Sequence, residues 1–143
     1  MASNPSHMYS RLLLTGAAGG LGRVLRPRLK ARCDVLRVSD LGDLGTATAG
    51  EEVMPAPLQD RPAVFKLLEG VDAVIHLGGI STEQPFDDIV QANIIGTYHL
   101  YEAARHTAHA ALCLPAPTTS LGFIAKMKWS MPTCPFALMA TTA

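Results

Sequence analysis

The chain has 143 residues, of which 48% are hydrophobic, and its twelve basic and twelve acidic side chains leave no net charge. This length and apolar content suit one domain with a sizeable core. Lys and Arg form no stripe that could follow a phosphate backbone, so we do not expect nucleic-acid binding. The first ten residues have no secretory apolar run, and no window reaches the roughly 18 apolar residues of a membrane span. We therefore expect a cytoplasmic protein that does not insert in a membrane.

The three cysteines, Cys33, Cys113 and Cys134, are odd in number, far apart and outside any Cys-x-x-Cys pair. Such spacing favours neither a disulfide framework nor a zinc site. We therefore expect reduced thiols and no bound metal.

The first predicted elements are a strand, a helix and a second strand. Residues 11–15 form a short apolar run that stops at Gly16, which is typical of a strand buried on both faces. Residues 35–40 predict a second strand, followed by a glycine-rich loop over 41–50. Between the strands, residues 20–32 predict a helix in which Pro27 favours a kink. Its apolar residues recur at helical spacing and predict one buried stripe: Leu21, Val24, Leu25 and Leu29.

The next predicted elements are weaker at their start. Residues 52–58 stand where a third strand belongs, but Pro55 and Pro57 favour an edge strand or an irregular segment. Residues 61–69 predict a helix with Gly70 just past its end. Residues 71–77 predict another buried strand, which stops at two glycines. A final helix is predicted over 85–106 with its apolar residues near one face: Phe86, Ile89, Val90, Ile94, Tyr98 and Tyr101.

Strands that alternate with helices predict an α/β fold, a parallel sheet with helices on both faces. We expect a flexible N-terminus over residues 1–10 and the folded domain over 11–106. Residues 107–143 carry four prolines without helical or alternating periodicity, which predicts an irregular tail.

A glycine-rich turn joins the first predicted strand to the first helix: Gly16-Ala17-Ala18-Gly19-Gly20-Leu21-Gly22. In that context the first glycine permits a tight turn, the second lets the backbone approach a pyrophosphate, and the third lets helix and strand pack closely. The free N–H groups of Gly20 and Leu21 would then face the phosphates, with help from the helix dipole.

Asp40 ends the second predicted strand. A carboxylate there can accept hydrogen bonds from both ribose hydroxyls and would repel a 2′-phosphate, which favours NAD over NADP. The alternative is an ordinary glycine-rich loop beside a surface aspartate.

Residues 11–22 resemble the opening of the extended short-chain dehydrogenases, and among them the uronate dehydrogenases most. Residues 76–81 are similar to that family's fourth strand, and residues 93–96 and 101–105 to the helix after it. The resemblance covers about residues 10–106. It implies a Rossmann-like, doubly wound parallel sheet, here truncated after the fourth strand and its helix.

The resemblance also implies roles for residues outside the glycine turn. Leu58 would lie near the adenine, and Ser81 would contact a uronic acid. The ribose and nicotinamide would be lined by Leu77, Gly78 and Gly79. Ser81 could instead be a loop serine that caps the next helix. His76 is better explained as a strand histidine with a hydrogen-bonded ring than as a catalytic group. Asn93 aligns with a family asparagine near the active site, although an asparagine in a helix is also ordinary.

The sequence departs from the family in two places. Pro57 stands where the family usually has an aspartate near the adenine, so one hydrogen-bond acceptor is missing. Past residue 106 the family's Ser-Ser-Asn-His strand end and its Tyr-x-x-x-Lys pair are absent, so no catalytic residue is assigned. Tyr98 and Tyr101 have no Lys four residues on and are expected in the core.

A shifted reading frame would explain the tail. In this frame the third base of each codon is read with the first two bases of the next codon. Met127-Lys128 must then encode Glu, Met131-Pro132 must encode Ala, and Met139-Ala140 must encode Gly. Those residues occur in this order in the family, so we hypothesise a frameshift between about residues 106 and 112.

In the family, as the resemblance implies, a tyrosinate deprotonates a hexuronic acid while hydride passes to NAD, which gives an aldaric acid lactone. This chain would be the NAD-binding portion and would be inactive by itself. Alternatives are the corresponding part of a sugar-nucleotide epimerase or dehydratase, a non-catalytic module, or a poorly folded fragment. Without a fifth strand the sheet would keep an open apolar edge, which favours a homo-oligomer.

Overall fold

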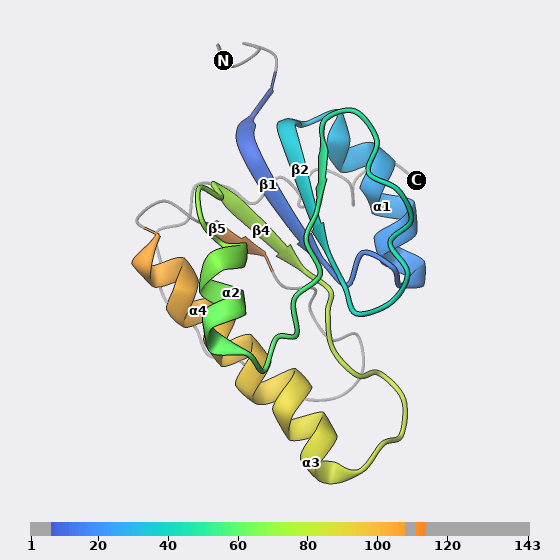
Figure 1. The fold of residues 1–143 in the computed structure, drawn as a ribbon, viewed down its shortest axis with the longest axis vertical. Helices are drawn as coiled ribbons and strands as arrows, with labels where there is room; N and C mark the ends of the chain where they lie inside the picture. The colour runs from blue at the N-terminus through green and yellow to red at the C-terminus, as the bar shows by residue number, and fades with distance from the viewer. Residues whose placement is uncertain (1–6, 108–110, 114–143) are drawn as a thin grey trace, which may run out of the picture.

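The computed structural model describes residues 7–107 and 111–113. Five parallel strands form one sheet in the order β3-β2-β1-β4-β5 (Figure 1). This Rossmann-like arrangement confirms the predicted fold class. The strands are β1 (Tyr9–Thr15), β2 (Cys33–Ser39), β3 (Glu51–Val53), β4 (Ala73–His76) and β5 (Ala111–Cys113). The helices are α1 (Gly20–Lys30), α2 (Arg61–Leu67), α3 (Phe86–Ile89), η1 (Val90–Ile95) and α4 (Gly96–His106).

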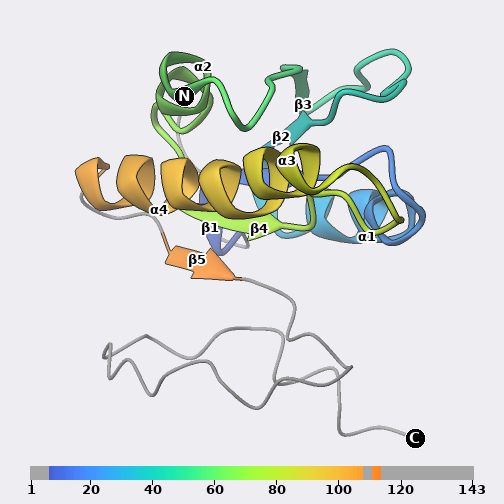
Figure 2. The same ribbon diagram turned by 90° about the horizontal axis from the view of Figure 1, so that it is seen from below.

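Helices cover both faces of the sheet. Figure 2 shows α1 on one face and α2 with α4 on the other. Strand β1 serves both cores, because Leu13 packs with Val64 and Leu100 whereas Leu12 and Leu14 pack on the α1 side. All three leucines are essentially inaccessible to solvent. The predicted strand buried on both faces is therefore confirmed.

The sheet has one strand more than the sequence predicted. β5 pairs with β4 in parallel, with Ala111 opposite Ala73 and Cys113 opposite Ile75. The expected truncation after the fourth strand is therefore wrong by one strand, and in the described residues β4 is not an open edge. A short apolar run over 110–114 carried the signal. Residues 114–143, to which the frameshift hypothesis mainly applies, lie outside the described residues.

Helix α1 forms where it was predicted and runs through Pro27 without a break. Leu25 is buried, but Leu21 and Val24 are exposed, so half of the predicted buried stripe is wrong. Leu21 lies in the first turn, at the rim of a cleft rather than against the sheet.

The third strand and the second helix follow the sequence prediction. β3 is short and lies at the edge of the sheet, just before Pro55 and Pro57. Helix α2 begins after Asp60, whose side chain accepts a hydrogen bond from the Ala63 N–H at 3.2 Å. Gly70, with φ of +67°, ends the turn that follows α2.

The last predicted helix is present, but its buried face is not the predicted one. Segments α3, η1 and α4 follow one another without a break, and η1 is a π-helical turn. Phe86, Ile94, Tyr98 and Tyr101 are exposed, whereas Gly96, Leu100 and Ala103 are buried. A π-turn holds an extra residue, so it rotates Tyr98 and Tyr101, which follow it, away from the stripe that regular helical spacing predicts. Among the described residues, no helix is long and apolar enough to cross a membrane.

Candidate nucleotide-binding site

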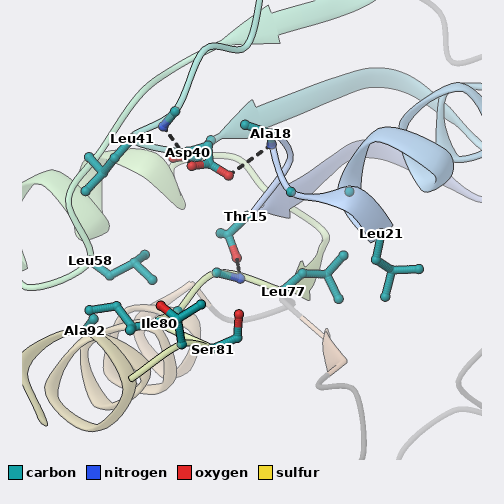
Figure 3. A pocket seen from close by; sticks show the side chains of 18 of the residues that line it. Thr15, Ala18, Leu21, Asp40, Leu41, Leu58, Leu77, Ile80, Ser81 and Ala92 are labelled. Atoms are coloured by element: carbon teal, nitrogen blue, oxygen red, sulfur yellow. Dashed lines mark hydrogen bonds between the residues drawn. The ribbon is translucent and has the colours of Figure 1, made fainter. Parts of the chain in front are cut away.

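A cleft of about 950 Å³ lies at the carboxyl ends of β1, β2 and β4 (Figure 3). The chain passes from β1 to β2 and β3 on one side and returns to β4 on the other, so the cleft lies where the strand order reverses. Open α/β sheets bind ligands at this point. The structure brings every residue proposed from the sequence to this cleft: Gly16, Gly19, Gly20, Leu21, Gly22, Asp40, Leu58, Leu77, Gly78, Gly79 and Ser81.

Two glycines of the turn are required by close backbone packing. Gly16 has φ of +69°, and a Cβ there would lie 2.5 Å from the Leu77 carbonyl carbon. A Cβ on Gly22 would lie 2.2 Å from the Gly16 carbonyl oxygen. Gly20 has nothing within 4 Å of a Cβ position, so its backbone faces open space. The turn therefore presents bare backbone to the cleft.

Helix α1 begins directly at this backbone. Gly19 is its N-cap and makes no side-chain capping hydrogen bond, while the Arg23 N–H donates to the Gly19 carbonyl at 2.9 Å. The first amides of a helix have no partner within the helix, and the helix dipole makes them attractive to anions. Gly20 and Leu21 carry two of these amides at the cleft wall.

Asp40 is fixed beside the glycine turn. Its carboxylate accepts hydrogen bonds from the Ala18 N–H and the Gly42 N–H, each at 2.9 Å. The first bond joins the end of β2 to the turn after β1 (Figure 3). Each carboxylate oxygen can accept a further bond, so Asp40 can still receive two hydroxyls of a ligand.

Arg23 is a cleft residue that the sequence analysis missed. It is the one cation among the described lining residues, which also include Asp40, Asp43 and Asp88. It follows the last glycine of the turn directly, and that position was the available signal. A guanidinium at this place suits a phosphate-bearing ligand.

The opposite wall of the cleft is the segment after β4. The Leu77 N–H donates to the Thr15 carbonyl at 3.2 Å, and the Gly78 N–H donates to Thr15 Oγ1 at 3.3 Å. From η1, Asn93 accepts from the Ile80 N–H at 2.7 Å and donates to the Ile80 carbonyl at 2.8 Å. The amide of Asn93 thus pairs with both backbone groups of one residue.

Ser81 continues this wall and is exposed. The N-cap of α3 is Pro85, and no side chain caps that helix. The alternative interpretation of Ser81 as a helix cap is therefore wrong. The serine hydroxyl is left at the mouth of the cleft.

His76 lies behind this wall and is buried. Its Nδ1 lies 2.7 Å from Thr15 Oγ1 and its Nε2 lies 3.2 Å from Thr97 Oγ1. Burial lowers the pKa of His76 to about 4, so the ring is neutral at pH 7. The prediction of a strand histidine with a hydrogen-bonded ring is confirmed.

The third wall is apolar. Leu41, Leu58 and Ala92 line it, and Figure 3 shows Leu41 beside Asp40, Ala92 beside Ile80 and Leu58 between them. His99 Nδ1 donates to the Leu58 carbonyl at 3.0 Å, which fixes the loop that carries Leu58. Pro57 is not among the lining residues, and Gln59 and Gln91 supply amide groups to the cleft instead.

The model of the NAD dependent epimerase/dehydratase family matches residues 12–117. The chain belongs to that family. It is 49% identical over 116 residues to a uronate dehydrogenase from Pseudomonas putida. The aligned residues make up 80% of this chain and 43% of that relative.

Solved structures agree with this assignment. A glucuronic acid dehydrogenase from Chromohalobacter salexigens matches with a TM-score of 0.70 and 50% identity over 72% of this chain and 39% of its own. A mutant uronate dehydrogenase from Agrobacterium tumefaciens complexed with NAD matches with a TM-score of 0.67 and 49% identity over 73% of this chain and 40% of its own. The chain thus spans about two-fifths of the length of these relatives.

Proposed function

We propose that this chain forms the NAD-binding portion of a dehydrogenase that oxidises a hexuronic acid to an aldaric acid lactone. The observation that carries the proposal is the convergence of the glycine turn, Asp40 and the segment after β4 on one cleft. The similarity of the chain to uronate dehydrogenases supports a hexuronic acid as the substrate class.

Separate parts of the cleft suit separate parts of a dinucleotide. The amides of Gly20 and Leu21 and the guanidinium of Arg23 suit the pyrophosphate. Asp40 suits the ribose hydroxyls and disfavours a 2′-phosphate. The apolar wall at Leu58 suits the adenine ring. NAD, when bound, supplies a hydride acceptor.

The other end of the cleft suits the nicotinamide ribose and the sugar acid. Gly78 and Gly79 expose backbone there, and the Ser81 hydroxyl can donate to a carboxylate or a sugar oxygen. Removal of a proton from the sugar needs a base, and the chain has no Tyr-x-x-x-Lys pair. We therefore propose cofactor binding without turnover for this chain alone.

A thermal melt with and without NAD tests the proposal, because a ligand that binds only the native state raises the midpoint. NAD at a hundred times its Kd would add about 2.7 kcal/mol of stability. We expect a rise with NAD and a smaller rise with NADP. Asp40→Ala should reduce the rise in the melting midpoint with NAD and make the rises with NAD and NADP more alike. Glu69→Gln, which removes a charge outside the cleft, should change neither rise. Equal melting points with and without NAD would reject the function.

We also propose that two copies of the chain pair along the exposed apolar face of α3, η1 and α4. Its residues are Phe86, Ile94, Tyr98 and Tyr101, and Phe86 is 78% exposed. Several large apolar side chains exposed along one helical segment suit an interface.

Charge favours an antiparallel pairing of these helices. Asp87 lies in the first turn of α3, and Arg105 and His106 lie in the last turn of α4. Two antiparallel copies bring the acidic end of one against the basic end of the other. Light scattering should give the mass of a dimer that Tyr98→Lys reduces to a monomer. A monomer at every concentration would contradict the pairing.

A further inference from the structure

Three side chains from three elements meet behind the segment after β4. Thr15 is the last residue of β1, His76 is the last residue of β4, and Thr97 lies in the first turn of α4. The imidazole of His76 lies between the two hydroxyls, at 2.7 Å from Thr15 and 3.2 Å from Thr97. Thr15 and His76 are also partners in the sheet register and are 1% and 5% exposed.

The hydrogen bonds of this group lead directly to the cleft. Thr15 Oγ1 accepts from the Gly78 N–H at 3.3 Å. A neutral imidazole donates from one nitrogen and accepts at the other. When the Thr15 hydroxyl donates to Nδ1, the Nε2 proton goes to Thr97, and Thr15 keeps an acceptor lone pair for Gly78. The backbone at Gly78 is thereby tied through His76 to helix α4.

We propose that His76 is a positioning residue that holds the Gly78–Gly79 side of the cleft for the nicotinamide ribose of the cofactor. The proposal rests on the proposed function, since it assigns that half of NAD to this wall. It goes further in one respect, because the imidazole touches no ligand and acts only through Thr15 and the backbone of Gly78.

In the described residues, the other half of the cleft makes no hydrogen bond with the side chains of this group. Asp40 is fixed by the Ala18 and Gly42 amides, and the glycine turn is fixed by packing of Gly22 on the Gly16 carbonyl. Loss of the imidazole should therefore weaken a ligand that reaches Gly78 and spare one that ends at the pyrophosphate. NAD and ADP are such a pair of probes.

The experiment is a calorimetric titration of the chain and its His76→Phe variant with NAD and with ADP. Phe keeps the ring bulk and removes both hydrogen bonds. We expect NAD to bind about tenfold more weakly to the variant, the effect of losing roughly one hydrogen bond's worth of free energy. ADP should bind within about twofold of its value for the parent chain. Unchanged NAD binding, or equal weakening of both ligands, would overturn the proposal.

A second variant covers the case in which His76→Phe does not fold. Thr97→Val removes one half-buried hydroxyl with little change in shape and should weaken NAD but not ADP, while Thr97→Ser should restore NAD binding. Thr107→Val is the matched control, because the Thr107 hydroxyl bonds the Ala103 and Ala104 carbonyls at the far end of the same helix. It should lower stability and leave both affinities unchanged. A Thr97→Val variant with the affinities of the parent would also overturn the proposal.

The two proposals fail in different ways. If the parent chain binds neither NAD nor ADP, the proposed function is rejected and the role of His76 falls with it. If the parent binds both and the ratio of the two affinities does not change in the variants, only the role of His76 is rejected.

Discussion

The two walls of the cleft are built in opposite ways. The glycine turn of residues 16–22 works through missing side chains, which let backbone touch backbone at Gly16 and Gly22. The segment of residues 77–81 is shaped by side chains added from elsewhere, namely Thr15, His76 and Asn93. The glycines of the first wall lie within seven consecutive residues, whereas the second wall bonds Asn93 and Thr15, which lie 13 and 63 positions from their partners. The local motif can therefore be found from its own spacing, whereas the residues of the opposing wall could be named only through the family resemblance.

The largest expected effect comes from filling the space that the first wall leaves empty. Gly16→Ala combines a positive φ with a Cβ 2.5 Å from the Leu77 carbonyl carbon. The strained backbone and the clash with fixed backbone together should cost about 4 kcal/mol or more, measured by urea denaturation. Such a loss would leave little of a small domain's stability.

Gly45→Ala is the matched control for that substitution. Gly45 also has a positive φ, +63°, but nothing lies within 4 Å of its Cβ position. This substitution should lower the free energy of unfolding by only about 1 kcal/mol, the cost of a left-handed backbone for a residue with a Cβ. Similar losses of stability at the two glycines would mean that the turn does not pack tightly on Leu77, and the contrast between the two walls would be contradicted.

An intermediate effect is expected from acid on the second wall. Burial lowers the pKa of His76 from 6.5 to about 4, so the unfolded chain binds the proton more readily than the folded chain. The stability that depends on the neutral ring is therefore complete above pH 6.5 and is lost as the pH falls toward 4, by about 3 kcal/mol in all.

The measurement is the free energy of unfolding at several pH values for the chain and for His76→Phe. The stability of the parent should fall relative to the variant between pH 6.5 and 4. The contribution of Glu51 to stability is lost at lower pH, because its hydrogen bonds with Arg26 lower its pKa from 4.5 to about 2. Parallel curves for the two proteins would show that His76 does not titrate in this window.

The sequence predicted those parts of the fold that depend on neighbours in the chain. The buried run at Leu12–Leu14, the glycine turn and Asp40 each carry their signal within a few residues. The structure has the leucines in the core and the other two features at the cleft. The exposed face of the last helix was missed because η1 changes the helical register between Ile89 and Gly96. Helical spacing does not predict a π-turn, because such turns are rare single-turn bulges within α-helices.

Asn93 joins this turn to the second wall of the cleft. It lies in the middle of η1, and its amide pairs with both backbone groups of Ile80. A Cβ on Gly79 would come within 2.8 Å of its Oδ1, so the wall and the asparagine are fitted closely. In the sequence Asn93 could equally be an ordinary helix asparagine, because the contacts that give it a role belong to the tertiary structure.

The smallest expected effect follows from removing that amide. Asn93→Leu keeps the size of the side chain and leaves the N–H and carbonyl of Ile80 without a partner in the protein. At this half-buried place the loss should be about 2 kcal/mol, measured by urea denaturation, because water can reach part of the exposed backbone. Gln91→Leu, an exposed amide two residues earlier on the same turn, should cost less than about 0.5 kcal/mol. If both variants lost the same stability, the second wall would not depend on its added side chains, and it would be held by the backbone as the glycine turn is.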